Sequence, residues 1–152
     1  MSGQTEDLLL GVALRRVAER YAYAADLGDG DLFAAQFVDD GVLESPRGLF
    51  EGRAALVAVP ALLRARYAET FHAVHNQVVH PAGEGAEAVT YCIARHFWHG
   101  EAGDLLCYEM TIRYLDLFAR ETGQWRLSRR RLVVLGTRTF PMEAAAPFAQ
   151  RD

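Results

Sequence analysis

The sequence contains little cysteine and no long apolar run. Its two cysteines, Cys92 and Cys107, lack the spacing of a redox or zinc motif and are too few for a disulfide framework. We interpret both as small buried side chains in a reducing cytoplasm. The longest apolar run covers residues 54–63 and includes Pro60, whereas a bilayer-spanning helix needs about 20 apolar residues. Residues 1–7 lack the basic start of a secretory signal, so we predict a cytoplasmic protein with no membrane segment.

Positive charge is scarce as well. The chain carries 16 basic and 20 acidic residues, which gives a net charge of −4. Proteins that bind nucleic acids usually present a basic face to the phosphates, so we expect no nucleic-acid partner. With 152 residues, 51% of them hydrophobic, the chain is long enough for a substantial core. We predict a single domain over residues 1–140 and a tail over residues 141–152, which either docks onto the domain or is disordered.

The first third of the sequence has the pattern of helices. One apolar stripe recurs at helical spacing and consists of Leu10, Leu14, Val17 and Tyr21. Asp31 can cap a short second helix, and Pro60 is expected to bend a third. The expected elements are, in order, a helix over residues 5–28, a helix over 32–38, a hairpin of strands 42–44 and 49–51, and a helix over 54–67.

The rest of the sequence has the pattern of long strands. Polar segments with glycine separate four stretches in which apolar residues alternate. Strands of about 15 residues would span roughly 50 Å if flat, so they must bend at bulges. We predict an α+β fold in which three N-terminal helices cover a cone-shaped, curved antiparallel sheet of four long meander strands and the short hairpin. The long strands are expected at residues 71–81, 86–99, 104–119 and 124–139.

A cone of this kind has an apolar interior that can bind a small molecule. A titratable side chain inside it is costly unless it is paired or used in chemistry. Asp26 lies at the end of the first predicted helix, on the side of Glu19 and Tyr23 and away from the apolar stripe. Helical geometry alone therefore indicates a solvated carboxylate at this position.

Histidines occur on two of the predicted strands. Strand alternation places His72 on one face together with Val74, Asn76, Val78 and His80. A single strand histidine is more often structural than catalytic. His72 and His80 would lie about 26 Å apart on an unbent strand, and His96 and His99 point to opposite faces. No metal site is therefore expected.

Arg130 is another charged residue predicted on an apolar face, which it shares with Leu132 and Val134. An arginine placed in this way pairs with an acid, binds an anionic ligand, or extends its head group to solvent. Aromatic residues elsewhere in the chain either line a pocket or belong to the core; these are Tyr23, Trp98 and Tyr108.

Five local motifs occur in order along the chain. They are YAYAADLGDGD from Tyr21, FVDDG from Phe37, GLFEGRA from Gly48, ETFHAVHN from Glu69, and YLDLFARETGQWRLSRR from Tyr114. Together these motifs resemble those of SnoaL-like proteins, which belong to the nuclear transport factor two-like superfamily. The resemblance implies an α+β cone fold, in agreement with the pattern of helices and strands.

The branch that these motifs resemble includes scytalone dehydratase and hexachlorocyclohexane dehydrochlorinase. In those enzymes an aspartate at the end of the first helix pairs with a histidine on the first long strand, which implies a catalytic pair of Asp26 and His72. An arginine used by the dehydrochlorinase corresponds to Arg130. The two tyrosines that scytalone dehydratase uses are absent: one corresponds to Ala25 of this chain, and the other falls near Ser45 or Pro46. Scytalone itself is therefore not the expected substrate.

The resemblance implies a cofactor-independent lyase or isomerase of the dehydratase, cyclase or isomerase type. Its substrate would be small and hydrophobic, of aromatic or polyketide character. His72, oriented by Asp26, would remove a proton from carbon, and Arg130 or His96 would stabilise the negative charge that develops. Neither a metal nor another cofactor is expected. The expected substrate-binding residues are Tyr23, His96, Trp98 and Tyr108.

Two other functions fit the same fold. A non-catalytic member would bind a hydrophobic metabolite in the cone, and a chain similar to the small β subunit of aromatic-ring dioxygenases would support a larger subunit. Catalysis is the interpretation that gives Asp26 and His72 a role. Proteins of this family usually dimerise, so we also expect a homodimer formed through the convex face of the sheet.

Overall fold

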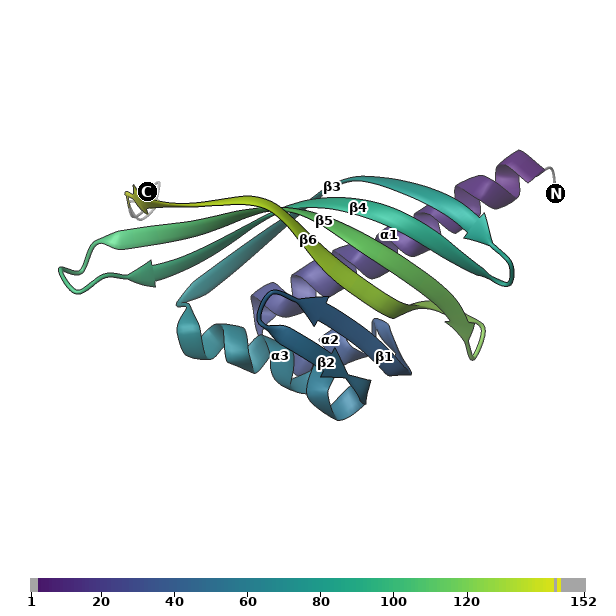
Figure 1. Ribbon diagram of the computed structural model, residues 1–152, viewed down its shortest axis with the longest axis horizontal. Coiled ribbons are helices and arrows are strands. Elements are labelled where there is room, and N and C mark those ends of the chain that lie inside the picture. Colours follow the sequence, from purple (N-terminus) through teal and green to yellow (C-terminus); the bar gives the residue numbers. More distant parts are fainter. Residues whose placement is uncertain (1–2, 144, 146–152) are drawn as a thin grey trace, which may run out of the picture.

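The computed structural model describes residues 3–143 and 145. The chain forms two helices, two short strands, a third helix and then four long strands, as Figure 1 shows. The elements are α1 (Gly3–Leu27), α2 (Gly30–Ala34), β1 (Phe37–Ser45), β2 (Gly48–Glu51), α3 (Gly52–Arg66), β3 (Glu69–Ala82), β4 (Gly85–His99), β5 (Leu105–Glu121) and β6 (Gln124–Met142). None of the described helices is long and apolar enough to span a membrane. The cytoplasmic location stays a prediction.

A single six-stranded sheet forms the centre of the molecule, with the order β2-β1-β6-β5-β4-β3. Its ends do not close on each other, and the three helices pack on one side (Figure 1). The predicted α+β cone of helices and curved sheet is therefore confirmed. One strand pair differs from the prediction, because β1 runs parallel to β6 while every other neighbouring pair is antiparallel.

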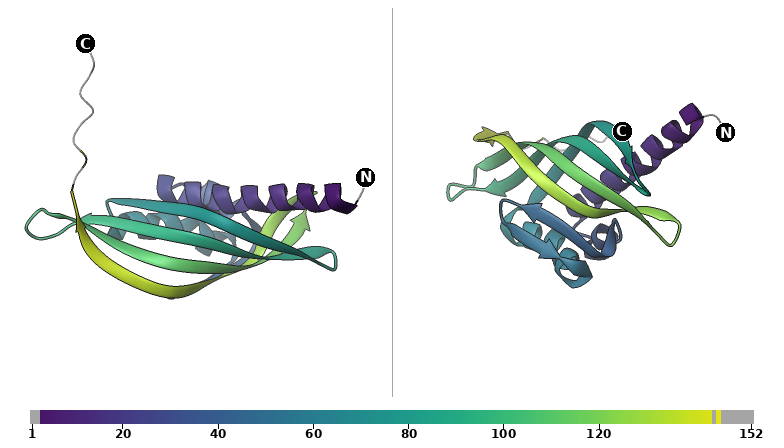
Figure 2. Two further views of the ribbon diagram at one scale, coloured as in Figure 1. Left: turned by 90° about the horizontal axis from the view of Figure 1, so that it is seen from above. Right: turned by 45° about the vertical axis from the view of Figure 1, so that its right-hand side comes forward.

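The long strands bend strongly, and Figure 2 shows them bowed, with α1 lying along one face of the sheet. The strand register shifts at three places along the long strands, which marks bulges or irregularities. These shifts lie between Val74 and Gln77, between Thr111 and Ile112, and between Leu117 and Phe118. The bend gives the sheet a concave side, which α1, α2 and α3 cover.

The bulge in β3 corrects one prediction about which side chains share a face. Regular alternation placed Val78 on the face of His72, but the extra residue after Val74 reverses the alternation. Beyond the bulge Gln77 donates a hydrogen bond to the buried hydroxyl of Thr90 at 2.9 Å. Val78, next to Gln77, is exposed. A bulge cannot be read from the period of the strand on which it occurs.

The short second helix begins and ends earlier than predicted. Asp29, and not Asp31, caps it, accepting a hydrogen bond from the backbone N–H of Leu32 at 2.9 Å. The helix ends at Ala34, and Phe37 begins strand β1. The physical reason is tertiary, because Phe37 pairs with Leu127 of β6 and is buried beside the rings of Tyr21 and Phe33.

The core lies between α1, α2, α3 and the concave side of the sheet. The predicted stripe of α1 faces it, with Leu14, Val17 and Tyr21 buried and Leu10 partly buried. Gly30 allows α2 to approach α3 closely, because a side chain at this position would collide with the carbonyl oxygen of Val57. Both cysteines are buried free thiols, as predicted. Pro141 and Met142 belong to β6, and most of the predicted tail lies outside the described residues.

One ion pair is completely buried in this core. Arg130 of β6 and Asp116 of β5 are cross-strand neighbours, and the guanidinium donates two hydrogen bonds to the carboxylate at 2.8 and 2.7 Å. The hydroxyl of Thr90 donates a third hydrogen bond to Asp116 at 2.8 Å. The guanidinium also lies between the rings of Tyr21 and Tyr114, 4.3 and 4.0 Å from their centres. Burial alone would lower the pKa of Arg130, but the charge of Asp116 raises it, so the arginine stays charged.

Removing one partner of this pair should destabilise the fold strongly. We expect Asp116→Ala to lower the free energy of unfolding by about 3–5 kcal/mol, because it leaves a buried charge without a partner. The matched control is Glu44→Ala, whose partner Arg129 is largely exposed; exposed pairs contribute about 1 kcal/mol or less. Urea unfolding followed by circular dichroism measures both changes. Equal losses in the two variants would contradict the structural role of the buried pair.

Candidate active site

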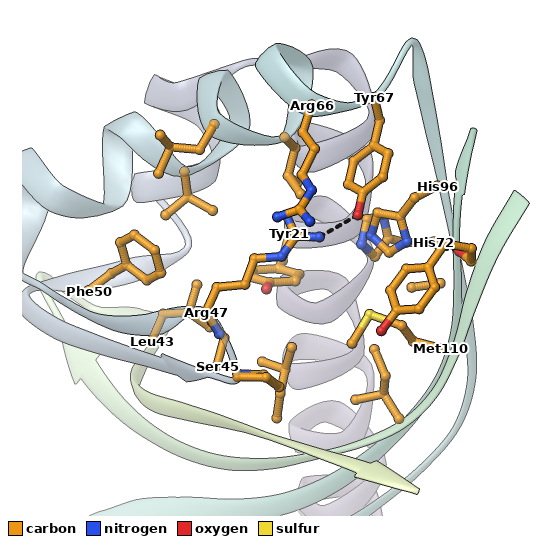
Figure 3. A pocket seen from close by; sticks show the side chains of 18 of the residues that line it. Tyr21, Leu43, Ser45, Arg47, Phe50, Arg66, Tyr67, His72, His96 and Met110 are labelled. Atoms are coloured by element: carbon orange, nitrogen blue, oxygen red, sulfur yellow. Dashed lines mark hydrogen bonds between the residues drawn. The ribbon is translucent and has the colours of Figure 1, made fainter. Parts of the chain in front are cut away.

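A cavity of about 940 Å³ lies between the concave side of the sheet and the helices that cover it. It is bounded by α3, by the β1–β2 hairpin, and by the long strands (Figure 3). Its walls are mainly apolar, with Leu43, Val59, Met110, Ile112 and Leu132 among them. The polar groups with ionisable or charged side chains on its walls are Arg47, Arg66, Tyr67, His72, His96, Tyr21, Tyr108 and Tyr114. A mainly apolar cavity of this size with few polar groups is typical of a small-molecule site.

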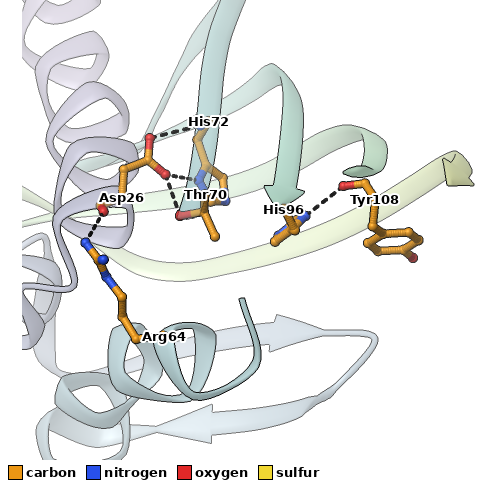
Figure 4. A network of polar contacts seen from close by, with 6 residues as sticks. All are labelled: Asp26, Arg64, Thr70, His72, His96 and Tyr108. Atoms are coloured by element: carbon orange, nitrogen blue, oxygen red, sulfur yellow. Dashed lines mark hydrogen bonds and ion pairs between the residues drawn. The ribbon is translucent and has the colours of Figure 1, made fainter. Parts of the chain in front are cut away.

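Asp26 and His72 meet at the edge of this cavity. Asp26 lies in the last turn of α1, and its carboxylate oxygen Oδ1 is 2.6 Å from His72 Nδ1 (Figure 4). Two further donors hold the carboxylate, namely the backbone N–H of His72 at 3.0 Å and the Thr70 hydroxyl at 2.8 Å. The imidazole lines the cavity, and Asp26 lies behind it. The carboxylate is therefore held by three hydrogen bonds from β3.

This placement differs from the solvated carboxylate that helical geometry alone predicts. The Asp26 side chain is 25% exposed and that of His72 is 8% exposed. The last turn of α1 lies against the start of β3, where Thr70 and His72 donate hydrogen bonds to Asp26, a contact that a helical wheel does not represent. Arg64 of α3 supports the same end by donating to the backbone carbonyl of Asp26 at 2.8 Å. The pair implied by the family resemblance is thus brought together.

The contacts of Asp26 determine both its charge and the tautomer of His72. Burial alone would raise the pKa of Asp26, but the hydrogen bonds and charge of His72, with the hydrogen bond of Thr70, hold it below its ordinary value. An ionised carboxylate only accepts hydrogen bonds, so Nδ1 of His72 carries a proton and donates it to Asp26. In the neutral ring the other nitrogen, Nε2, is then the basic atom.

His96 lies beside His72, with ring centres 5.7 Å apart and the rings nearly perpendicular. Its Nδ1 is 3.1 Å from the backbone carbonyl oxygen of Tyr108, so Nδ1–H donates to that oxygen. Burial, with a smaller contribution from the nearby charge of His72, lowers the pKa of His96 to about 4. His96 is therefore neutral at physiological pH, and its Nε2 is an acceptor.

Three cavity residues escape the sequence reasoning, namely Tyr67, Arg47 and Arg66. Tyr67 follows α3, and its ring packs against His96 at 4.8 Å between centres. Arg47, at the turn of the β1–β2 hairpin, donates a hydrogen bond from Nη2 to the Tyr67 hydroxyl at 2.6 Å (Figure 3). The available signal was the arginine-rich end of α3, which includes Arg64 and Arg66.

The other predicted site residues divide into two groups. Trp98, Tyr108 and His96 line the cavity, and their role in substrate binding stays a prediction. Tyr23 does not line it, because it lies on the outer side of α1 and is 60% exposed. Arg130 does not line it either: it is 0% exposed and bound to Asp116. The expectation that Arg130 faces the substrate is corrected for this reason, since a buried acid on the next strand already neutralises it.

The described residues contain no cluster of three or more metal-ligating side chains. The rings of His72 and His96 and the side chain of Tyr67 lie together on the wall of the largely apolar cavity.

The comparison with known families identifies the chain. The SnoaL-like domain family matches residues 6–131. The protein therefore belongs to the SnoaL-like family, within the nuclear transport factor two-like superfamily. No curated protein matches the sequence.

Solved structures share the fold at low sequence identity. A provisionally named scytalone dehydratase from Novosphingobium aromaticivorans is 22% identical over 98% of this chain and 99% of its own, with a TM-score of 0.79. A hexachlorocyclohexane dehydrochlorinase is 16% identical over 97% of this chain and 100% of its own, also with a TM-score of 0.79. A protein of unknown function from Mycobacterium tuberculosis is 24% identical over 88% of this chain and 76% of its own, with a TM-score of 0.75. These similarities show a shared fold.

The charge state of His96 can be tested directly. Because its pKa is lowered to about 4, its ring should stay neutral, with the proton on Nδ1, between pH 5 and pH 8. Nitrogen-15 NMR of labelled protein measures both the tautomer and the titration. The reference is the ordinary pKa of a histidine side chain, about 6.5. A His96 midpoint near that value would contradict the burial argument.

Proposed function

We propose that the protein is a cofactor-independent lyase or isomerase that uses His72 as a general base. The observation that carries this proposal is the 2.6 Å contact between Asp26 Oδ1 and His72 Nδ1, at the wall of a largely apolar cavity. A histidine whose Nδ1 is held by an ionised carboxylate is the usual arrangement for proton abstraction. The substrate is a small hydrophobic molecule of aromatic or polyketide character, matched to the apolar walls.

The reaction begins with transfer of a proton from a substrate carbon to Nε2 of His72. The carbon must be acidified by a neighbouring carbonyl or by a leaving group on the next carbon. In a lyase, the C–H electron pair forms the new double bond while the leaving group departs with its own pair. In an isomerase, the pair is held as an enolate until the proton returns from His72 to another carbon. Each course is balanced without an external oxidant or reductant.

Asp26 stabilises the imidazolium that forms when His72 takes the proton. Its carboxylate stays ionised. Hydrogen bonds from the Thr70 hydroxyl and the His72 backbone fix the carboxylate, which orients the His72 ring through Nδ1. The base is therefore assigned to His72.

Stabilisation of the developing oxyanion is assigned to Tyr67 in place of Arg130. Its hydroxyl oxygen already accepts a hydrogen bond from Arg47 at 2.6 Å, so its own proton is free to be donated into the cavity. The cationic neighbour makes that proton a stronger donor. His96 has the opposite role: its Nδ1–H is used by Tyr108, so Nε2 accepts a hydrogen bond from a substrate hydroxyl.

The structural relatives support an elimination more than a hydrolysis or a redox reaction. Two of them are named for loss of water or of hydrogen chloride, a scytalone dehydratase and a hexachlorocyclohexane dehydrochlorinase. Both of those named reactions break a C–H bond and release a leaving group. The dyad and the apolar cavity of this chain suit the same class of chemistry.

The proposal predicts that His72 is needed for proton removal from carbon. We would follow two signals by NMR in D₂O for a panel of cyclic and aromatic ketones and β-hydroxy ketones, namely deuterium incorporation and loss of water. A reversible enolate exchanges its proton with the solvent, whereas a concerted elimination releases water without prior exchange. His72→Ala should slow this proton removal at least about 10²-fold, the usual contribution of a general base. Asp26→Asn should slow it as well, because the variant loses the charge that stabilises the imidazolium.

The matched control is His80→Ala, which removes an exposed histidine of the same strand that does not line the cavity. It should leave the exchange rate unchanged. Equal rates in wild type and His72→Ala would reject the assignment of the base. Saturable binding of the panel with neither exchange nor loss of water in any form of the protein would favour a non-catalytic binding role.

We also propose that the chain forms a homodimer through the outer face of the sheet. Phe71 and Leu117 are 56% and 42% exposed, although each is a large apolar side chain. Each alternates with a residue that faces inward, since His72 lines the cavity and Asp116 is buried. Both therefore point to the convex side, where a second copy would cover them.

Sedimentation velocity tests the homodimer. Wild type should sediment as a dimer, and Phe71→Glu should shift it toward the monomer by placing a charge in the interface. Leu9→Glu is the control, because Leu9 is equally exposed but lies on α1, on the other side of the sheet. A wild-type chain that stays monomeric at high micromolar concentration would reject the proposal.

A further inference from the structure

Two arginines point into the cavity without a carboxylate to pair with. Arg47 comes from the β1–β2 turn and Arg66 from the end of α3, and both line the cavity. Within the described part of the chain, neither guanidinium lies within salt-bridge distance of an aspartate or glutamate. By contrast, Arg129 and Arg130 have acidic partners at 2.6 and 2.7 Å.

Both guanidinium groups gather around a single ring. Arg47 Cζ lies 5.2 Å and Arg66 Cζ 5.9 Å from the centre of Tyr67. Figure 3 shows the two side chains extending into the cavity from different walls, with Tyr67 beyond them and His72 and His96 next to Tyr67. Two like charges on one aromatic ring repel each other, and an anion bound between them offsets that repulsion.

The rest of the cavity adds no negative charge. No aspartate or glutamate is among its described lining residues. The carboxylate of the dyad, Asp26, lies behind His72 and already accepts three hydrogen bonds. An anionic ligand group would therefore meet two guanidinium groups without opposition from an acid.

We propose that Arg47 and Arg66 form an anion subsite beside Tyr67, so that the substrate carries a carboxylate or a similar anionic group on its hydrophobic body. This inference rests on the proposed function in one respect, because it takes the bound anion to be the substrate. Binding of an anion by the two arginines can be measured without any reaction. The anion binds near the hairpin turn and the end of α3, and the apolar body extends along the sheet wall toward His96 and His72. Specificity for an acid over a neutral molecule of the same shape follows.

The test compares two probes of equal shape, 2-naphthoate and 2-naphthamide, by isothermal titration calorimetry at pH 7. The first is anionic and the second neutral, and either ring system suits an apolar cavity of this size. We expect the wild-type protein to bind naphthoate at least about tenfold more tightly than naphthamide, the discrimination typical of a charge-assisted contact. Arg47→Gln and Arg66→Gln should each weaken naphthoate several-fold and leave naphthamide unchanged. The double variant should abolish the preference.

The control for net charge is Arg53→Gln, on the same helix as Arg66 but outside the cavity lining. It should leave both affinities unchanged. Equal affinity of the two probes for the wild type, no saturable naphthoate binding in the millimolar range, or an effect of Arg53→Gln as large as that of Arg66→Gln would overturn the subsite. Thermal unfolding of each variant verifies that the fold is intact.

The same titrations on His72→Ala separate this inference from the proposed function. That variant should keep the preference for naphthoate, because the subsite does not include His72. If His72→Ala keeps the preference for naphthoate and also keeps the wild-type rate of deuterium exchange, the catalytic assignment is rejected and the anion subsite stays supported. Loss of the preference in the arginine variants, with exchange still dependent on His72, would support both.

Discussion

The bend of the sheet is the constraint on which the rest of the structure depends. Strand β6 has 19 residues and β5 has 17, and a flat strand of 19 residues would span about 60 Å. Strands of this length can enclose a core in a small domain only by curving, and their bulges allow this. Curvature creates a concave side whose apolar residues the helices must cover. They cover it incompletely, and a cavity of about 940 Å³ remains under α3 and the hairpin.

Charge is distributed in this cavity according to one pattern. Two carboxylates are paired with a basic group: Asp26 with His72, and Asp116 with Arg130. Neither carboxylate is among the described residues that line the cavity. Arg130 is thereby a buried structural cation, whereas Arg47 and Arg66 line the cavity without an acidic partner among the described residues. The acid–base chemistry and the anion binding that we propose are compatible for this reason.

Much of the fold could be predicted from the sequence because its signals are local. The stripe of α1, the glycine-containing turns and the alternation in β5 each depend on neighbours along one element, and the resulting α+β cone was predicted correctly. The site was harder. The helical wheel indicated a solvated Asp26, and only the similarity to SnoaL-like motifs paired it with His72. Tyr67, Arg47 and Arg66 carried no motif, since their shared cavity unites a turn and a helix end that lie about 20 residues apart in the sequence.

The sequence by itself determined the class of fold, the order of its elements and the chemical types available: histidines and arginines, no lysine, and two isolated thiols. Only the tertiary structure decided which of these groups face the cavity. Arg130 and Arg66 are the same residue type, yet one is neutralised by Asp116 across β5 and β6 and the other is not. The bulge after Val74 likewise reverses the faces of β3. Such outcomes depend on strand register and bulge position, which are set by contacts between distant segments and not by local pattern.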